Sequence, residues 1–193
     1  MKEGKESMES TREKRAKNKR AKSKQVIIAA AKSLFEEKGL RHVTFNDVAK
    51  KAEMCRTTIF NYFTSINELM LAIMDEEVRN LMAFCETSRS EGIELVLDVF
   101  SKIIDDTARF PVLTTKLIAG SMLDIKRRKV ISKIEEIINN AFAEKSVEEI
   151  ERRVVLITGA YYGIVNHYFL NGKKLDPNKM KREFRNYVAP LLV

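Results

Sequence analysis

Residues 44–69 constrain the fold of this chain more than any other segment. Their sequence, TFNDVAKKAEMCRTTIFNYFTSINEL, predicts two short helices joined by a tight turn, with a further helix beginning directly after them. Thr44 with Asp47 three residues later is a pattern that caps a helix start, and Ser65 with Glu68 repeats it before the last helix. Helices joined by so short a turn pack at a steep angle. The outer side chains of the second helix are therefore available to a partner.

A strongly basic segment, residues 12–24 (REKRAKNKRAKSK), lies just before this region. Residues 1–24 contain ten Lys or Arg and four Glu, and they carry +6 of the chain's net charge of +8. Such a segment can bind a polyanion by releasing its counterions, or it can be a disordered tail that improves solubility. Both interpretations stay open for the segment alone, and we expect residues 1–22 to form a flexible arm.

The rest of the chain also has helical rather than alternating periodicity. Only three Pro and seven Gly interrupt its 193 residues, and no pair of alternating segments predicts a hairpin. We therefore expect an all-α protein, with a three-helix helix-turn-helix domain at 23–65 and a helical bundle at 66–193. The expected helices cover 23–38, a short stretch from 45, 56–62, 66–84, 91–109, 112–119, 124–143, 146–170 and a last stretch from 177.

Composition and motifs argue against several function classes. No long apolar stretch predicts a membrane span, and the charged start lacks the apolar segment of a secretory signal, so we expect a cytoplasmic location. The two cysteines, Cys55 and Cys85, lack metal-ligand spacing. The two histidines, His42 and His167, belong to no catalytic motif. We predict no metal, no cofactor, no disulfide and no enzymatic activity.

The second helix of the short pair carries side chains that suit DNA, while Ile59 and Phe63 are its expected inward anchors. Arg can bond guanine, and Asn can bond adenine, through two hydrogen bonds each. Thr and Tyr hydroxyls suit phosphate oxygens, as do the free N–H groups at a helix start. The predicted DNA-binding residues are Lys22, Lys24, Thr44, Arg56, Thr57, Thr58, Asn61 and Tyr62.

These residues and their spacing resemble the DNA-binding domain of the TetR family of bacterial transcription regulators. The family pattern has a first helix ending F-x-x-x-G, then T-x-x-x-I-A-x-x-A, a turn, and T-[LI]-[YF]-x-[HY]-F-x-[SN]-K-x-x-L. The matching residues here are Phe35, Gly39, Thr44, Val48, Ala49, Ala52, the run Thr58-Ile59-Phe60-Asn61-Tyr62-Phe63-Thr64-Ser65, and Leu69. The motif resemblance covers about residues 24–70. Beyond them only the size and the helical layout are similar.

Three positions depart from the family pattern. The turn has Glu53-Met54-Cys55 where Gly and then Ser are usual, and Cys is a weaker helix cap than Ser. Phe60 stands where Tyr often supplies a hydroxyl, and Ile66 replaces a Lys that contacts the DNA backbone in relatives. We therefore expect phosphate binding to depend more on other groups. These are Thr44, Tyr62 and the basic arm around Lys22 and Lys24.

For the C-terminal part, the resemblance implies a homodimer that binds a small apolar effector and then releases a palindromic operator, as a repressor does. Its apolar residues can line an effector pocket, or they can simply form the core. The pocket candidates are Phe84, Phe100, Ile104, Leu117, Met122, Tyr161, Tyr162 and His167. The dimer-interface candidates are Gly159, Gly163, Phe184 and Tyr187.

Two alternatives to an effector-controlled repressor stay open. The first is a DNA-binding regulator that acts without a small molecule. The second is a helical adaptor whose basic arm docks on an anionic membrane surface. The arm has few large apolar residues to insert into lipid, which argues against the adaptor. The expected partners are double-stranded DNA, a second copy of the chain and an effector of unknown identity, with no membrane.

Overall fold

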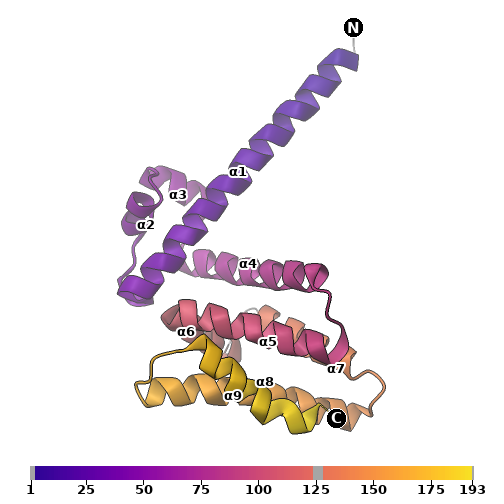
Figure 1. Ribbon diagram of the computed structural model, residues 1–193. Helices are drawn as coiled ribbons and strands as arrows, with labels where there is room; N and C mark the ends of the chain where they lie inside the picture. Colours follow the sequence, from indigo (N-terminus) through magenta and orange to yellow (C-terminus); the bar gives the residue numbers. More distant parts are fainter. Residues whose placement is uncertain (1–2, 124–127, 193) are drawn as a thin grey trace. The chain divides into compact units, whose positions relative to one another are not determined.

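The computed structural model describes residues 3–123 and 128–192, with side chains for 12–119 and 128–192. Every regular element in these ranges is a helix, which confirms the all-α prediction (Figure 1). The elements are α1 (Glu3–Lys38), η1 (Leu40–His42), α2 (Phe45–Lys51), α3 (Arg56–Tyr62), α4 (Ile66–Thr87), α5 (Gly92–Arg109), α6 (Pro111–Leu123), α7 (Lys129–Ala141), α8 (Val147–Leu170), α9 (Pro177–Val188) and η3 (Ala189–Leu191). The chain divides into two compact units, Met1–Ile73 and Met74–Val193.

The first unit packs α1, α2, α3 and the start of α4 around an apolar core. Among the side chains of α1 described from residue 12 onward, the buried ones begin at Ile27 and recur at helical spacing, so one face of the helix between residues 27 and 35 joins the core. The largest fully buried side chains of this unit are Phe35, Phe63, Ile27, Ile28, Ile59, Leu69 and Ile73. Ile59 and Phe63 point inward, as the sequence predicts. Between residues 12 and 26, only Ser23 is even partly buried.

Helix α1 begins at Glu3 rather than near Ser23, so the segment expected to be a flexible arm is helical. The physical reason lies in its composition. Ala, Lys, Arg and Glu are good helix formers, and the segment has no Pro and no Gly after Gly4. A high charge does not prevent a helix when the backbone preference favours one. The 36 residues of α1 make a helix of about 54 Å, at about 1.5 Å per residue.

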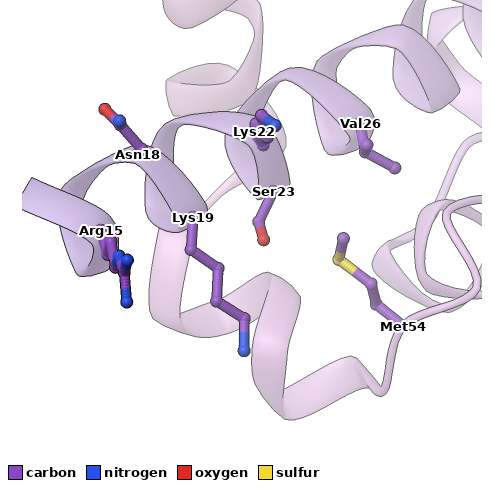
Figure 2. Close-up of a pocket in the computed structure, with 7 residues that line it drawn as sticks. All are labelled: Arg15, Asn18, Lys19, Lys22, Ser23, Val26 and Met54. Carbon is purple, nitrogen blue, oxygen red and sulfur yellow. The ribbon is translucent and has the colours of Figure 1, made fainter.

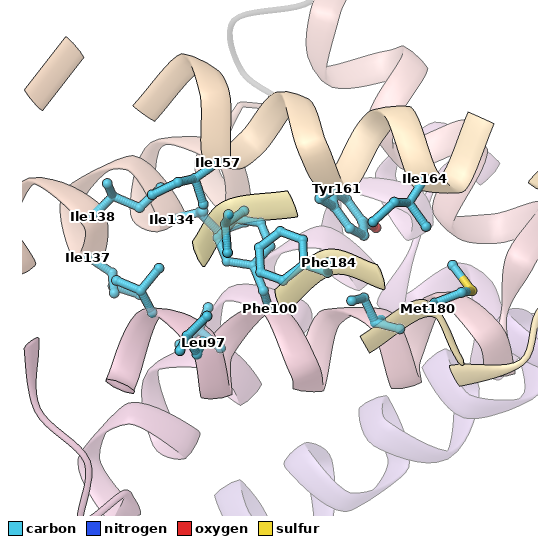
Figure 3. Packing of buried hydrophobic residues seen from close by; sticks show 14 of the residues in the cluster. Leu97, Phe100, Ile134, Ile137, Ile138, Ile157, Tyr161, Ile164, Met180 and Phe184 are labelled. Carbon is cyan, nitrogen blue, oxygen red and sulfur yellow. The ribbon is translucent and has the colours of Figure 1, made fainter. Parts of the chain in front are cut away.

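The second unit has its core between α5, α7, α8 and α9. Helix α5 packs against α6, α7 and α9, while α8 packs against α7 and α9. Figure 3 shows the side chains that meet in this core: Leu97 and Phe100 from α5, Ile134, Ile137 and Ile138 from α7, Ile157, Tyr161 and Ile164 from α8, and Met180 and Phe184 from α9. The Phe100 and Phe184 rings stack with their centroids 4.7 Å apart. Through this contact the core joins α9 to α5.

Two polar side chains are also buried in this unit. The Thr107 hydroxyl donates to the Ile103 carbonyl at 2.8 Å, so its oxygen accepts the hydrogen bond from the Tyr161 hydroxyl at 2.7 Å. Burial raises the pKa of Tyr161 well above its ordinary value. The Arg153 Nε donates to the Leu191 carbonyl at 3.0 Å, which attaches η3 to α8. These bonds satisfy the Thr107 and Tyr161 hydroxyls and the Arg153 Nε, which would be costly to bury alone.

Most predicted helix bounds agree with the structure to within a few residues, and α3 agrees at both ends. Helix α6 runs past the expected end near Ala119 to Leu123, so Gly120 does not terminate it. His42, which falls between two of the expected helices, lies in the short η1 helix. The expected helix start at Asp124 lies outside the described residues. None of the described helices combines the length and apolar character needed to cross a lipid bilayer.

Candidate DNA-binding site

The N-terminus of α2 is held by a complete capping box. The Thr44 side chain accepts from the Asp47 backbone N–H, and the Asp47 carboxylate accepts from the Thr44 backbone N–H at 2.9 Å. The Lys38 ammonium donates to the same carboxylate at 2.6 Å. The hydrogen bond from Lys38, with those from Thr44, holds the pKa of Asp47 far below its ordinary value. The capping box orders the start of α2, and the exposure of Thr44 leaves this start accessible to solvent.

The turn between α2 and α3 forms a Schellman motif with an unusual residue at its left-handed position. The Met54 N–H donates to the Ala49 carbonyl at 2.9 Å and the Glu53 N–H to the Lys50 carbonyl at 3.3 Å. Glu53 has a φ of 54°, which makes it the one non-glycine residue with positive φ among the described residues. A Cβ disfavours this conformation by about 1–2 kcal/mol. The turn expected from the resemblance is thus present, at a cost in backbone strain.

The C-terminus of α8 has the same motif with glycine at that position. There the Lys173 N–H donates to the Tyr168 carbonyl at 2.9 Å and the Gly172 N–H to the Phe169 carbonyl at 3.2 Å. Gly172 has a φ of 57°, close to that of Glu53. The chain therefore contains a matched pair of Schellman turns, one relaxed and one strained.

Replacing the strained residue should stabilise the first unit. We expect Glu53→Gly to raise its free energy of unfolding by about 0.5–1 kcal/mol, because relief of the left-handed strain exceeds the extra backbone entropy of glycine. Urea unfolding followed by circular dichroism measures this change. The reverse exchange, Gly172→Glu, serves as the control and should destabilise the second unit. A lower stability of Glu53→Gly would contradict the strain argument.

Helix α3 begins at Cys55, whose side chain makes no hydrogen bond to the backbone of the first turn. Its sulfur instead lies 2.9 Å from the Thr58 hydroxyl. The contact with the Thr58 hydroxyl is the largest cause that lowers the pKa of Cys55. Thr58, a predicted DNA-binding residue, is therefore partly buried and already bonded within the chain, and it faces Cys55 rather than open solvent.

The outer face of α3 brings together three of the predicted DNA-binding residues. Arg56, Thr57 and Asn61 are all exposed on this helix of 7 residues. The Arg56 guanidinium lies 5.2 Å from the centre of the Phe60 ring. Phe60 is 43% exposed, and its ring meets that of Phe45 edge to face at 4.8 Å. The Phe60 ring, which packs on Phe45, therefore contacts the Arg56 side chain and adds an apolar patch to this face.

The other predicted DNA-binding residues lie along α1 and at the end of α3. Tyr62 is partly buried, and the Arg20 guanidinium lies 5.9 Å from its ring centre. The Lys24 ammonium lies 5.7 Å from the Phe63 ring centre. Hydrogen bonds from the Thr64 backbone and side chain lower the pKa of Glu68, and the charge of Lys24 adds a smaller effect. Lys24 is thus partly engaged within the unit. Lys22 is exposed and belongs to a separate surface.

A groove of about 420 Å³ runs along α1 beside the turn that precedes α3 (Figure 2). Its lining is basic, with a single large apolar side chain from the turn. The lining residues are Arg15, Asn18, Lys19, Lys22, Ser23, Val26 and Met54. Sequence reasoning missed Arg15, Lys19 and Met54 as parts of one surface. The signal that identifies the α1 members is their spacing of three and four residues, which becomes meaningful once the segment is known to be a helix.

The residues predicted to line an effector pocket do not form one pocket in the structure described. Phe100, Ile104 and Tyr161 are buried and close-packed in the core of the second unit, so for these three the core interpretation holds. His167 is exposed, and its ring nitrogens lie 3.2 Å from the Asn171 amide and 2.8 Å from the Lys173 ammonium, so it does not line an interior pocket. The partly buried candidates are Phe84, Leu117 and Tyr162, and the Met122 side chain lies outside the described residues.

Three of the four predicted dimer-interface residues lie on the surface. Gly159 and Gly163 are exposed, and a Cβ placed on either would meet no described atom of the chain within 4 Å. Tyr187 is 61% exposed. Phe184 is a correction, because it is 2% exposed and stacks on Phe100 inside the core. The sequence shows that Phe184 is an apolar residue of α9, but it does not show whether its side chain packs in its own core or against a second subunit.

The sequence and the fold were compared with known proteins. Residues 27–73 match the family model for bacterial regulatory proteins of the tetR family. The uncharacterized HTH-type transcriptional regulator YvdT of Bacillus subtilis (strain 168) is 29% identical over 134 residues, which are 64% of this chain and 69% of that protein. The residues that match the family model, 27–73, include α2, the turn and the outer face of α3.

Solved structures of similar fold cover most of this chain. A TetR transcriptional regulator from Rhodococcus sp. RHA1 aligns with a TM-score of 0.59 and 23% identity over 88% of this chain and 96% of its own. The regulator FadR from Bacillus subtilis, solved in complex with stearoyl-CoA, aligns with a TM-score of 0.66 and 18% identity over 87% of this chain and 97% of its own. At these identities the likeness establishes the fold, with both parts of the chain included.

Proposed function

Because residues 27–73 form a TetR-family DNA-binding domain, this chain is a TetR-family transcriptional regulator, and we propose that it represses transcription by binding a palindromic operator as a homodimer. The family consists of DNA-binding regulators rather than enzymes.

The outer face of α3 carries the proposal. It presents an exposed Arg56 and an exposed Asn61 on a short helix that follows a tight turn. These two side chain types can read guanine and adenine in the major groove through paired hydrogen bonds. Between them, Phe60 offers an apolar edge that suits the methyl group of thymine. Thr57 and the ordered start of α2 at Thr44 suit the phosphates that border the groove.

An exposed stripe on α8 supports the homodimer. Val155 is 67% exposed and Leu170 is 77% exposed, and both fall on the same side of the helix as Gly159 and Gly163. The glycines permit close helix approach, and no described part of the same chain uses it. A second copy that packs on this stripe would bury its apolar side chains. A two-fold dimer then requires an operator with matching two-fold symmetry.

We propose that a small effector with an apolar part binds the second unit and releases the operator. FadR from Bacillus subtilis, which has a similar fold, binds stearoyl-CoA. Here Phe84 and Tyr162 are partly buried against the core, so they can move aside at a lower cost than the packed core residues. Stearoyl-CoA is the first probe. It should weaken operator binding, because a ligand shifts the equilibrium only by its difference in affinity for the two states.

Selection of bound sequences from random DNA tests the proposed function. The purified chain should enrich a palindrome whose half-sites are about 34–36 Å apart or slightly more, as two recognition helices on successive major grooves require. The position of that palindrome in the genome then identifies the regulated promoter. Failure to enrich any sequence at low salt would refute the operator-binding role.

A further inference from the structure

The basic segment of α1 has two distinct charged sides rather than one diffuse charge. At 3.6 residues per turn, Arg15, Lys19 and Lys22 fall on one side, whereas Lys14 and Lys17 fall on the other. The first three line the groove beside Met54, which precedes the first residues of α3 (Figure 2). Glu13, the one acidic residue between 12 and 24, lies outside this lining. The groove therefore combines a row of cations with a position next to the recognition helix.

We propose that this groove binds the phosphodiester backbone of the DNA that flanks the bases read by α3. Among the described side chains, no carboxylate forms an ion pair with Arg15, Lys19 or Lys22. These cations are exposed, so they are free to replace the counterions of a polyanion. The inference rests on the DNA binding proposed above and adds a second, sequence-independent contact to it.

The spacing of the cations fits a DNA strand. Arg15 and Lys22 are seven residues apart in one helix, which is about 10 Å along the axis. Over about 10 Å of duplex, one strand presents about three phosphates, at about 3.4 Å of axis each. Three cations in this row can therefore meet successive phosphates while the helix stays straight. A rigid row also loses less conformational entropy on binding than a disordered arm would.

The composition of the groove favours DNA over a membrane surface. Amphipathic helices that bind lipid carry large apolar side chains opposite their charges. Between residues 12 and 24 the apolar residues are only Ala16 and Ala21. Val26 and Met54 lie at one end of the groove, next to the helix pair. The segment has too little apolar surface to insert into a bilayer.

Two charge-matched double variants test the proposal. Arg15→Gln/Lys19→Gln removes two cations from the groove, and Lys14→Gln/Lys17→Gln removes two from the other side of the same helix. Gln has a helix preference close to that of Lys and Arg, so α1 should be retained, as circular dichroism can verify. Each protein is titrated with two duplexes of the selected operator, one ending at the half-sites and one extended by a helical turn on both sides, over a range of salt concentrations.

The unaltered chain should bind the extended duplex more tightly than the short one. Arg15→Gln/Lys19→Gln should lose this advantage and lower the salt slope on the extended duplex by about 3.6 per homodimer, since two phosphate contacts are lost in each subunit and each contributes about 0.9. Lys14→Gln/Lys17→Gln should keep the advantage. Equal losses for the two variants, or equal losses on the two duplexes, would overturn the proposal but leave operator binding intact. Absence of operator binding by the unaltered chain would instead refute the proposed function.

The same proteins are also tested on phosphatidylserine vesicles. Weak binding by all three, with no difference between the two double variants, agrees with a DNA-binding groove. Vesicle binding that only Arg15→Gln/Lys19→Gln loses, with unchanged binding of both duplexes, would assign the groove to a membrane surface and overturn the proposal.

Discussion

Changing Arg56 and Asn61 together to alanine should remove most of the operator preference of this regulator. Both side chains are exposed on α3 and can each form two hydrogen bonds with a base. A good base contact of this kind contributes about 1–3 kcal/mol of discrimination. The double variant should therefore lose about 10²- to 10⁴-fold in affinity at each half-site, at about 1.4 kcal/mol per factor of ten, and the homodimer loses these contacts at both half-sites. Fluorescence anisotropy with the selected operator measures this loss.

A scrambled duplex of the same length separates base reading from charge. Its affinity should fall much less, because the variant removes one cation and leaves the remaining phosphate contacts in place. Arg79→Ala/Asn80→Ala is the matched control, since both residues are exposed on α4 and the charge change is the same. Equal losses on the operator and on the scrambled duplex would show that Arg56 and Asn61 bind the backbone rather than the bases.

Phe184→Ala should strongly destabilise the second unit. Phe184 is 2% exposed, and its ring stacks on Phe100 at 4.7 Å, between α5 and α9. Loss of a buried Phe side chain costs about 3–5 kcal/mol, because the apolar transfer energy is lost and a cavity remains. Four of the five Tyr residues lie in this unit, so tyrosine fluorescence during urea unfolding reports mainly on it.

Phe184→Leu is the control for this change. Leucine retains most of the apolar volume, so it should cost clearly less than alanine. The result also decides between the two roles considered for Phe184. If it contacted a partner subunit rather than its own core, the cost of Phe184→Ala would depend strongly on protein concentration. A cost that is independent of concentration is expected from its burial in the single chain.

The sequence was most informative where capping residues mark the helix ends. Thr44 and Ser65 each precede a helix with an acidic residue three positions later, and the structure begins helices directly after both. Helix α3 agrees with its predicted bounds at both ends. These signals are local, because a cap satisfies backbone groups within one turn of the chain. They do not depend on how distant segments pack.

The basic arm could not be assigned correctly from its charge alone. A high net charge does not show that a segment rich in Ala, Lys and Arg is disordered, because these residues have a high intrinsic helix propensity. In the structure, α1 is continuous from Glu3. Its helical periodicity therefore places Arg15 and Lys19 on the side that lines the groove and Lys14 and Lys17 on another side. The candidate site therefore extends beyond the residues selected from the family pattern.

Other parts of the site depended on tertiary packing. An apolar residue at helical spacing can face its own core or a partner, and only the fold places Phe184 inside. Likewise, the sequence identified Thr58 as a DNA-binding residue, but its hydroxyl is bonded to Cys55. Glu53 in the turn was recognised as unusual from the sequence. Its positive φ became evident only from the backbone geometry of the Schellman motif in the structure.

The unbroken course of α1 makes the length of its basic segment as important as its charge. Each residue inserted between the groove and the core portion of the helix would rotate the preceding cations by about 100° and move them by about 1.5 Å. Lys and Arg could replace each other there with little effect on the alignment with α3. Over evolution, this segment should therefore accept exchanges between Lys and Arg readily, whereas insertions and deletions should be selected against.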